Sequence, residues 1–241
     1  MKAVAIIVAG GLGRRMKNDV SKQYILLGDM PVLSHTLRIF EKASNIGHIV
    51  LVVPKDDIDY ARTSIVEKYR ISKVRHIVAG GRQRQDSVKN GLAVVSDKDE
   101  IVLIHDGVRP FVSEELIDVS VQKAFGEDAV TVGVPVKDTV KSVDGNGLIT
   151  KTLKRNTLWL TQTPQVFKTA IIKKAYQKAY EDNFYGTDDA SLVEHINVRV
   201  KMIAGSYNNI KITTPEDLQI GEFLLKTRKE SRSEVQIANA F

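Results

Sequence analysis

A glycine-rich segment followed by basic side chains lies near the start of the chain, directly after an apolar run. Gly10, Gly11 and Gly13 come first, and Arg15 and Lys22 follow. Glycines allow the backbone to come close to a ligand, and the exposed N–H groups of such a loop form a concavity that suits an anion. Because Arg15 and Lys22 add full positive charges, the segment predicts a phosphate-binding loop. Taken alone, it is more typical of a glycine-rich turn with solvated arginines.

Two commoner phosphate loops do not fit this segment. A dinucleotide-binding fingerprint that begins at Gly11 and Gly13 requires glycine or alanine three residues later, where this chain has Met16. A P-loop requires Gly-Lys-Ser or Gly-Lys-Thr to close the turn, and no such sequence follows Gly13. The chemistry of the loop therefore has to be judged from the rest of the chain.

Three further apolar runs are followed by polar segments. The first leads to Gly81 and Ser87, the second to Asp106 and Arg109, and the third to Thr139. In open α/β sheets, ligands bind outside the carboxyl ends of the strands. If the runs are neighbouring strands, these segments meet at one edge of the sheet, where a helix N-terminus favours an anion or a polar base edge.

Asp106 has two chemical interpretations. A lone aspartate after a central strand is where Mg2+ bridging to a nucleotide phosphate is expected, because hard oxygen ligands and substrate phosphates share that ion. The alternative is a structural ion pair between Asp106 and Arg109. The neighbouring His105 has no second histidine at ligand spacing, so we expect an orienting or structural role for it and no catalytic one.

The C-terminal half adds further basic and hydroxyl-bearing residues. Arg155 precedes Trp159, Thr163 lies in a Gln-Thr-Pro-Gln segment, and Lys211 lies between two isoleucines before a capped helix. Trp159, the only tryptophan, is more typical of a packing anchor than of a base-stacking platform. Thr187 and the two aspartates after it are typical of a helix N-cap with an acidic first turn.

Short β-branched runs alternate with amphipathic stretches along the chain, which is typical of βαβ units on a mostly parallel sheet. Several amphipathic stretches open on serine, aspartate or proline, as helix starts do. We therefore predict a three-layer α/β/α sandwich with a mostly parallel, Rossmann-like sheet. The expected strands are Val4–Val8, Ile49–Val53, Val74–Ala79, Ile101–Ile104, Ala129–Val134 and Val198–Ile203, and the expected helices are Pro31–Lys42, Ile58–Tyr69, Asp86–Val95, Ser113–Phe125, Lys168–Glu181 and Pro215–Leu225.

One segment departs from this alternation. Thr139–Val143 and Leu148–Leu153 flank the turn sequence Asp144-Gly145-Asn146-Gly147, and both arms carry as many polar as apolar residues. On the sequence, a dimerisation arm and an exposed hairpin at a sheet edge are about equally expected. No linker or repeat divides the chain, so we predict a single domain over residues 1–241 with an arm at about 137–160.

Composition limits the classes of partner. The chain has 241 residues, of which 43% are hydrophobic, and a formal net charge of +6, which favours anionic partners. Its basic residues are scattered and lack interleaved aromatics, so we expect phosphorylated small molecules and no nucleic acid. No apolar run is long enough to cross a bilayer, so no membrane partner is expected. The absence of cysteine excludes thiolate chemistry and fits a cytoplasmic protein.

Taken together, and in their order along the chain, the motifs described above closely resemble those of the 2-C-methyl-D-erythritol 4-phosphate cytidylyltransferase (IspD) family. The ribitol-5-phosphate cytidylyltransferases share most of these motifs, but the segments around Thr139 and Arg155 are more similar to the methylerythritol enzymes. Gly10 and Gly107 replace alanines that are common in the family. The motifs that carry the resemblance are the glycine-rich loop with Lys22-Gln23, Gly80-Gly81-Arg82 with Asp86-Ser87-Val88, His105-Asp106 with Arg109-Pro110, Asp138-Thr139, Gln162-Thr163-Pro164-Gln165 with Phe167, and Asn209-Ile210-Lys211.

The resemblance implies that CTP and a polyol phosphate react to give a CDP-polyol and pyrophosphate, with Mg2+ held largely by the nucleotide phosphates. It implies that Arg15 and Lys22 stabilise the α-phosphate in its transition state. It also implies that Arg155 and Lys211 position the acceptor phosphate. The remaining implied contacts are Ala9, Gly10, Gly11, Gly13, Gly81, Ser87, Asp106 and Gly107 for the nucleotide, Arg109, Thr139, Thr163 and Thr187 for the polyol phosphate, and Asp106 for the metal and the incoming substrate.

The resemblance further implies a homodimer that exchanges its hairpin arms, with Arg155 and Thr163 serving the partner's site. Two other hypotheses stay open on the sequence. One keeps the chemistry and takes ribitol 5-phosphate as the acceptor, and the other is a nucleotide-binding or RNA-binding regulator without turnover. The combination of Arg15, Lys22 and Lys211 with Arg155 argues against the regulator, since a pure binder has no need for cations around a reacting phosphate.

Overall fold

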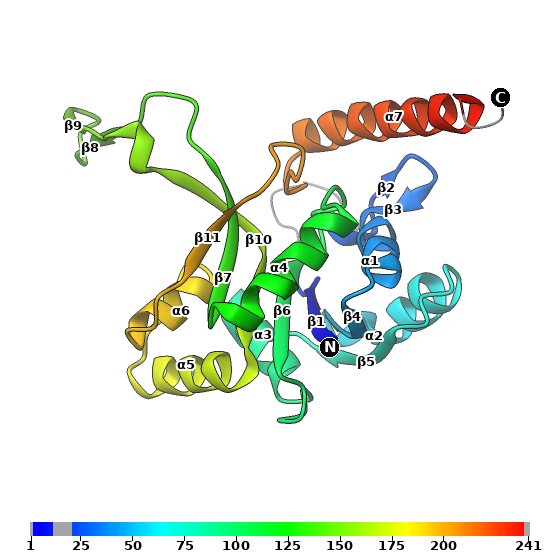
Figure 1. The fold of residues 1–241 in the computed structure, drawn as a ribbon, viewed down its shortest axis with the longest axis horizontal. Coiled ribbons are helices and arrows are strands. Elements are labelled where there is room, and N and C mark those ends of the chain that lie inside the picture. Colours follow the sequence, from blue (N-terminus) through cyan, green and yellow to red (C-terminus); the bar gives the residue numbers. More distant parts are fainter. Residues whose placement is uncertain (1, 12–20, 239–241) are drawn as a thin grey trace.

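The computed structural model describes residues 2–11 and 21–238, with side chains up to residue 228. A seven-stranded sheet with the strand order β11-β7-β10-β6-β1-β4-β5 forms the centre of the molecule (Figure 1). Its neighbouring strands run parallel, except that β10 pairs antiparallel with β6 and β7. The strands are β1 Ala3–Val8, β4 Ile46–Val53, β5 Val74–Ala79, β6 Ile101–Asp106, β7 Ala129–Pro135, β10 Trp159–Lys168 and β11 Lys201–Ala204.

Alternate side chains of each strand point to opposite faces of the sheet, and a helix layer covers each face. Ala5 and Ile7 of β1 pack in a cluster with side chains of α1, α4 and the π-helix Ala61–Glu67. Val4 and Ile6 pack in a second cluster with side chains of α3, α5 and α6. The predicted three-layer α/β/α sandwich is confirmed. The helices are α1 Val32–Lys42, α2 Ile58–Tyr60, α3 Arg84–Leu92, α4 Glu114–Gly126, α5 Thr169–Glu181, α6 Asp189–His195 and α7 Pro215–Ala238.

Strand β10 is the main element that was not predicted from the sequence pattern. Its centre contains Gln162, Thr163 and Gln165, which hide the alternation of apolar residues, yet all three side chains are buried. Their hydrogen-bond partners include Asp106, Asp188 and Asn209, which lie far away along the chain. Strand β11 is also displaced, since it covers Lys201–Ala204 where Val198–Ile203 was expected.

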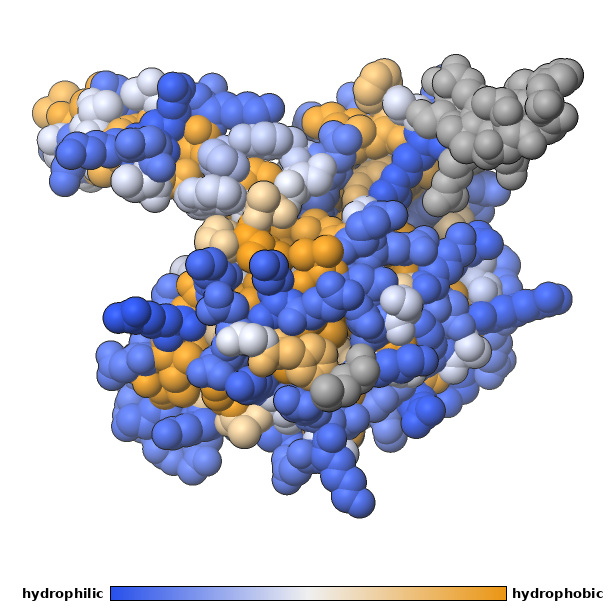
Figure 2. Space-filling model, viewed as in Figure 1, coloured by the Kyte–Doolittle hydropathy of each residue, from blue (hydrophilic) through white to orange (hydrophobic). Residues whose placement is uncertain are grey.

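Two smaller hairpins complete the fold. β2 Leu26–Leu27 and β3 Met30–Pro31 precede α1, and β8 Lys141–Val143 and β9 Ile149–Thr152 project away from the central sheet (Figure 1). Gly147 in the predicted turn has a φ of 82°, which glycine adopts without strain. Apolar and hydrophilic residues are mixed over the projecting hairpin (Figure 2), where Val143, Leu148 and Ile149 are exposed. Its role as a dimer arm stays a prediction.

Within residues 2–11 and 21–238, no helix combines the length and the apolar character that crossing a bilayer requires.

Candidate active site

The carboxyl edge of the sheet contains a cavity of about 870 Å3, called here the larger cavity. Segments that follow β1, β4 and β5 line it, together with the end of β6. The predicted site residues on its wall are Ala9, Gly10, Gly11, Lys22, Gly81, Ser87, Asp106 and Lys211. The predicted Gly13 and Arg15 lie outside the described residues.

Two loops meet at this cavity because the glycines at their contact, Gly10 and Gly80, carry no side chain. A Cβ on Gly10 would lie 3.2 Å from Oγ of Ser87, and a Cβ on Gly80 would lie 3.3 Å from Cα of Gly10. Oγ of Ser87 accepts a hydrogen bond from the N–H of Gly81 at 3.1 Å and donates to the carbonyl of Gln83 at 3.0 Å. Ser87 therefore fixes the shape of the second loop at the start of α3.

Gly107, predicted as a nucleotide contact, does not line the larger cavity. Its N–H donates to the carbonyl of Val8, and its carbonyl accepts from the Thr36 hydroxyl at 2.9 Å. A Cβ at this position would lie 3.0 Å from Cβ of Ala9. Gly107 therefore allows close packing behind the first loop.

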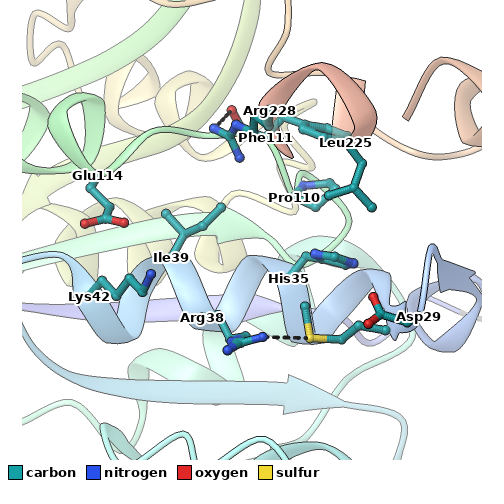
Figure 3. Close-up of a pocket in the computed structure, with 11 residues that line it drawn as sticks. Asp29, His35, Arg38, Ile39, Lys42, Pro110, Phe111, Glu114, Leu225 and Arg228 are labelled. Atoms are coloured by element: carbon teal, nitrogen blue, oxygen red, sulfur yellow. Dashed lines mark hydrogen bonds between the residues drawn. The ribbon is translucent and has the colours of Figure 1, made fainter. Parts of the chain in front are cut away.

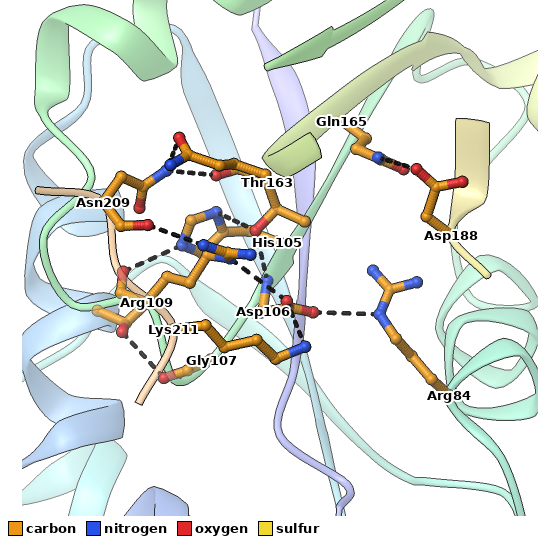
Figure 4. A network of polar contacts seen from close by, with 12 residues as sticks. Arg84, His105, Asp106, Gly107, Arg109, Thr163, Gln165, Asp188, Asn209 and Lys211 are labelled. Atoms are coloured by element: carbon orange, nitrogen blue, oxygen red, sulfur yellow. Dashed lines mark hydrogen bonds and ion pairs between the residues drawn. The ribbon is translucent and has the colours of Figure 1, made fainter. Parts of the chain in front are cut away.

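The carboxylate of Asp106 lies between three cations from separate segments (Figure 4). Nε of Arg84 donates to Oδ1 at 3.1 Å, and Nζ of Lys211 is 2.9 Å from Oδ2. The ion pair with Arg109 is present as well, with Nε 3.5 Å from Oδ2. Since Arg84 begins α3 and Lys211 precedes α7, these contacts join distant parts of the chain at one carboxylate.

Burial and charge act in opposite directions on the pKa of Asp106. Burial disfavours the carboxylate and raises its pKa, whereas the charges of Arg84, Lys211 and Arg109 lower it. The attraction outweighs burial, so the pKa of Asp106 lies well below its usual range. The side chain is therefore ionised at neutral pH and acts as a fixed negative charge that holds the cations together.

Thr163 and His105 fix the backbone of Asp106. The N–H of Asp106 donates to Oγ1 of Thr163 at 3.1 Å, and the same hydroxyl is 3.1 Å from Nδ1 of His105. Nε2 of His105 is 3.2 Å from the carbonyl oxygen of Arg109. Because a carbonyl can only accept, Nε2 carries the proton and the Thr163 hydroxyl donates to Nδ1. This geometry agrees with the orienting role expected for His105.

A smaller cavity of about 280 Å3 adjoins this network. The predicted residues Arg109, Thr163 and Thr187 line it. Arg84, Asp106 and Lys211 line both cavities, so these three side chains form their common boundary. The arrangement can hold one anionic ligand on each side of a cluster of cations.

Two predicted contacts do not join this group. Thr139 and Arg155 line neither cavity, and Nη1 of Arg155 donates to the carbonyl of Lys137 at 2.6 Å near the base of the projecting hairpin. The expectation that Thr163 serves a partner's site is wrong, because β10 enters the central sheet and places this threonine beside Asp106 of the same chain. The role of Arg155 in a partner's site stays a prediction.

Arg84 lines the site but was not predicted from the sequence. The chain offers Arg82 and Arg84 within one polar segment, and only the second lines both cavities and pairs with Asp106. The available signal was its place at the start of the helix that follows Gly80-Gly81. Gln83 and Asp86 form a capping box there, which sets the first turn of α3.

The described side chains do not by themselves fit a magnesium site. They include no group of three or more His, Cys, Asp or Glu residues that could hold a metal ion. Asp106 offers a carboxylate, but both of its oxygens already contact cations. Since Mg2+ prefers several hard oxygen ligands, a metal at this edge would take most of them from a bound phosphate.

Another hollow, of about 300 Å3, lies beside Pro110 and Phe111 (Figure 3). It is bounded by α1, by Pro110 and Phe111, and by α7. Cationic side chains such as Arg38 and acidic ones such as Glu114 share its wall. No predicted site residue that the structure describes lines it, so the candidate active site is limited to the two cavities at the sheet edge.

Comparisons with known proteins identify the family. The sequence model of the IspD family, described as 2-C-methyl-D-erythritol 4-phosphate cytidylyltransferase, matches residues 3–227. The chain belongs to this family. A 2-C-methyl-D-erythritol 4-phosphate cytidylyltransferase from Syntrophus aciditrophicus is 52% identical over 231 residues, which cover 96% of this chain and 98% of the relative. Another from Alkaliphilus metalliredigens is 48% identical and covers 95% of each chain.

Solved structures agree with this assignment to the cytidylyltransferase family. The crystal structure of 4-diphosphocytidyl-2C-methyl-D-erythritol synthase from Anaerococcus prevotii has a TM-score of 0.83 at 38% identity. It covers 93% of this chain and 96% of its own. The resemblance inferred from the motifs is therefore confirmed.

Neutral, buried His105 leads to a prediction about acid stability. Burial lowers the pKa of His105 from 6.5 to about 3, so between these values the unfolded chain binds a proton that the folded chain does not. The free energy of unfolding should therefore fall as the pH is lowered through this window, by about 1.4 kcal/mol per pH unit for one fully protonated group. Urea unfolding between about pH 5 and 7 should show a shallower fall for His105→Gln than for the unchanged chain. Equal slopes in the two proteins would contradict this assignment.

Proposed function

We propose that this chain transfers the cytidylyl group of CTP to 2-C-methyl-D-erythritol 4-phosphate. The products are 4-diphosphocytidyl-2-C-methyl-D-erythritol and pyrophosphate, which places the reaction in the non-mevalonate synthesis of isoprenoid precursors. The observation that carries the proposal is the meeting of two cavities at Arg84, Asp106 and Lys211, in a chain that matches the cytidylyltransferase family over residues 3–227. One cavity accommodates each substrate, and the shared cations lie where the two phosphates meet.

In this reaction a phosphate oxygen of the polyol phosphate attacks the α-phosphorus of CTP. A new P–O bond forms, the bond to the β-phosphate oxygen breaks, and pyrophosphate leaves with the bonding electrons. No covalent bond to the protein is needed, so catalysis depends on alignment of the two substrates and on fixed positive charge around the reacting phosphate.

We assign the larger cavity to CTP. The glycine loops around Gly10 and Gly81 allow the backbone to approach the base, and Lys22 supplies charge for the phosphates. Arg15 remains a predicted partner of Lys22 at the α-phosphate. The smaller cavity takes the polyol phosphate, with Arg109 and Lys211 beside it.

In the proposed reaction, Mg2+ would bind together with the nucleotide. Bound to the triphosphate, it would neutralise phosphate charge, with Asp106 as the nearby carboxylate. The role of this chain is to provide the cavity and the cations around the nucleotide. A cytoplasmic location, expected for a chain without cysteine, also stays a prediction.

We further propose that two copies of the chain form the catalytic unit. The base of the projecting hairpin carries Arg155, which lines neither cavity of its own chain. The hairpin also exposes Val143, Leu148 and Ile149, and an apolar surface of this kind is suited to a protein partner. In the proposed dimer, Arg155 of one copy completes the polyol-phosphate site of the other.

The acceptor assay tests the proposed reaction. Pyrophosphate release from CTP and Mg2+ should occur with 2-C-methyl-D-erythritol 4-phosphate, because the chain belongs to the family of that name. D-ribitol 5-phosphate, in a parallel assay, should give little release. Turnover with ribitol phosphate alone would contradict the proposed acceptor, and no release with either acceptor from folded protein would contradict the reaction.

Mixed dimers test the assignment of residues to sites. Lys22→Ala and Arg155→Ala should each lower turnover by about 10²–10³-fold, since each removes one positioned charge. A dimer with one chain of each kind contains one intact site, because Lys22 acts in its own chain and Arg155 in the other. Co-expressed, differently tagged chains should therefore recover about half of the unchanged turnover per dimer.

The matched control for this experiment pairs Lys22→Ala with Lys211→Ala. Both residues act in their own chain, so the mixed dimer should stay inactive. No recovery in the Lys22 and Arg155 mixture, or a monomeric mass for the unchanged chain in solution, would contradict the shared site.

A further inference from the structure

Arg84 connects two carboxylates that belong to different elements. Its Nε donates to Oδ1 of Asp106 at 3.1 Å, and its Nη2 donates to Oδ2 of Asp189 at 2.8 Å. Asp106 ends β6 and lines both cavities, whereas Asp189 begins α6 and lines neither. Arg84 therefore links the site to a carboxylate outside it.

Asp189 is held in place from several sides. Its side chain is only 1% exposed, and the hydroxyl of Tyr176 donates to its Oδ1 at 2.6 Å. Its backbone N–H donates to Oε1 of Gln165 at 3.0 Å. A buried carboxylate is stable only when charges or hydrogen bonds compensate its lost hydration, and here Tyr176 and Arg84 provide that compensation. The position of Asp189 is thus fixed independently of any substrate.

The hydroxyl of Tyr176 limits how Arg84 can bind Asp189. A guanidinium pairs most strongly with a carboxylate when two N–H groups meet both oxygens. The Tyr176 hydroxyl holds Oδ1 of Asp189, so the carboxylate is oriented with Oδ2 toward Nη2 of Arg84, while Nε of Arg84 contacts Asp106. Without the hydroxyl, the carboxylate of Asp189 is free to turn, and its contact with Arg84 is no longer fixed in this orientation.

The other oxygen of Asp106 shows why this matters for the site. Oδ2 contacts Lys211 at 2.9 Å while Arg84 holds Oδ1 (Figure 4). If Arg84 leaves, Oδ1 loses this contact, and the carboxylate that positions Lys211 is held less firmly. Asp106, Arg84 and Asp189 thus connect Lys211, at the boundary of the two cavities, to a hydroxyl on α5.

We propose that Tyr176 and Asp189 are positioning residues for the transfer reaction, which keep Arg84 on Asp106 and thereby keep Lys211 in place. This inference rests on the proposed function, because the rate of that reaction is its readout. A pair with a purely structural role would affect the stability of the fold and leave the rate constant of the folded enzyme unchanged.

Tyr176→Phe tests the proposal with the smallest change. It removes the hydroxyl and keeps the buried ring. The kcat of pyrophosphate release should fall about tenfold, the effect of losing one hydrogen bond to a charged group. The KM for CTP should change by less than about twofold, because Tyr176 does not line the larger cavity.

Tyr180→Phe is the matched control. Tyr180 lies one turn further along α5, and its hydroxyl also donates to an aspartate, Asp86. That aspartate binds the backbone N–H of Gln83 and not the side chain of Arg84. The control should therefore keep the kcat of the unchanged chain within about twofold.

Arg84→Lys gives a second measurement, which also serves if Tyr176→Phe fails to fold. Lysine keeps the charge but does not form the planar fork that bridges two carboxylates, so kcat should fall. Unchanged kcat in Tyr176→Phe or in Arg84→Lys, or an equal loss in Tyr180→Phe, would overturn the inference. No turnover in the unchanged chain would overturn the proposed function itself, so the two failures can be distinguished.

Discussion

The negative charge of Asp106, buried at the end of β6, is the constraint on which the candidate active site depends. A buried carboxylate needs partners, and removing one partner from a buried ion pair is strongly destabilising. Arg84 and Lys211 reach it from the start of α3 and from the segment before α7. Their contacts bring these segments to the carboxyl edge of the sheet, where the same cations surround the place at which two phosphates would meet.

The antiparallel strand β10 makes this arrangement possible. It pairs with β6 on one side and β7 on the other, so Thr163 comes beside the N–H of Asp106. Gln165 on the same strand accepts from the N–H of Asp189, which anchors α6 and the far end of Arg84. Strand β10, with its polar centre, thus supports Asp106 in two ways. Thr163 fixes the backbone of Asp106, and Gln165, through Asp189 of α6, fixes its partner Arg84.

Sequence patterns predicted the parts of the fold that depend on local periodicity. The apolar runs at β1, β4 and β6 and the Asp-Gly-Asn-Gly turn are strong local signals, and all appear in the structure near their expected positions. β10 was missed because its buried polar residues find partners distant in sequence, which no local pattern reveals.

The same distinction applies to the candidate site. The glycine loops and Asp106 could be chosen from the sequence, because a turn after an apolar run marks the edge of a sheet. Arg84 could not be separated from Arg82 without knowing where α3 begins. The roles of Asp189 and Tyr176 depend on distances between α5, α6 and α3, so only the folded chain makes them visible.

The turnover of Asp106→Asn, at saturating CTP and 2-C-methyl-D-erythritol 4-phosphate, tests the central claim most directly. The substitution keeps the shape of the side chain and removes the charge that holds Arg84, Arg109 and Lys211 together. With folding verified by circular dichroism, we predict a loss of at least about 10²-fold in kcat, by analogy with the removal of a positioned group that stabilises a transition state. A folded variant with the turnover of the unchanged chain would contradict the account.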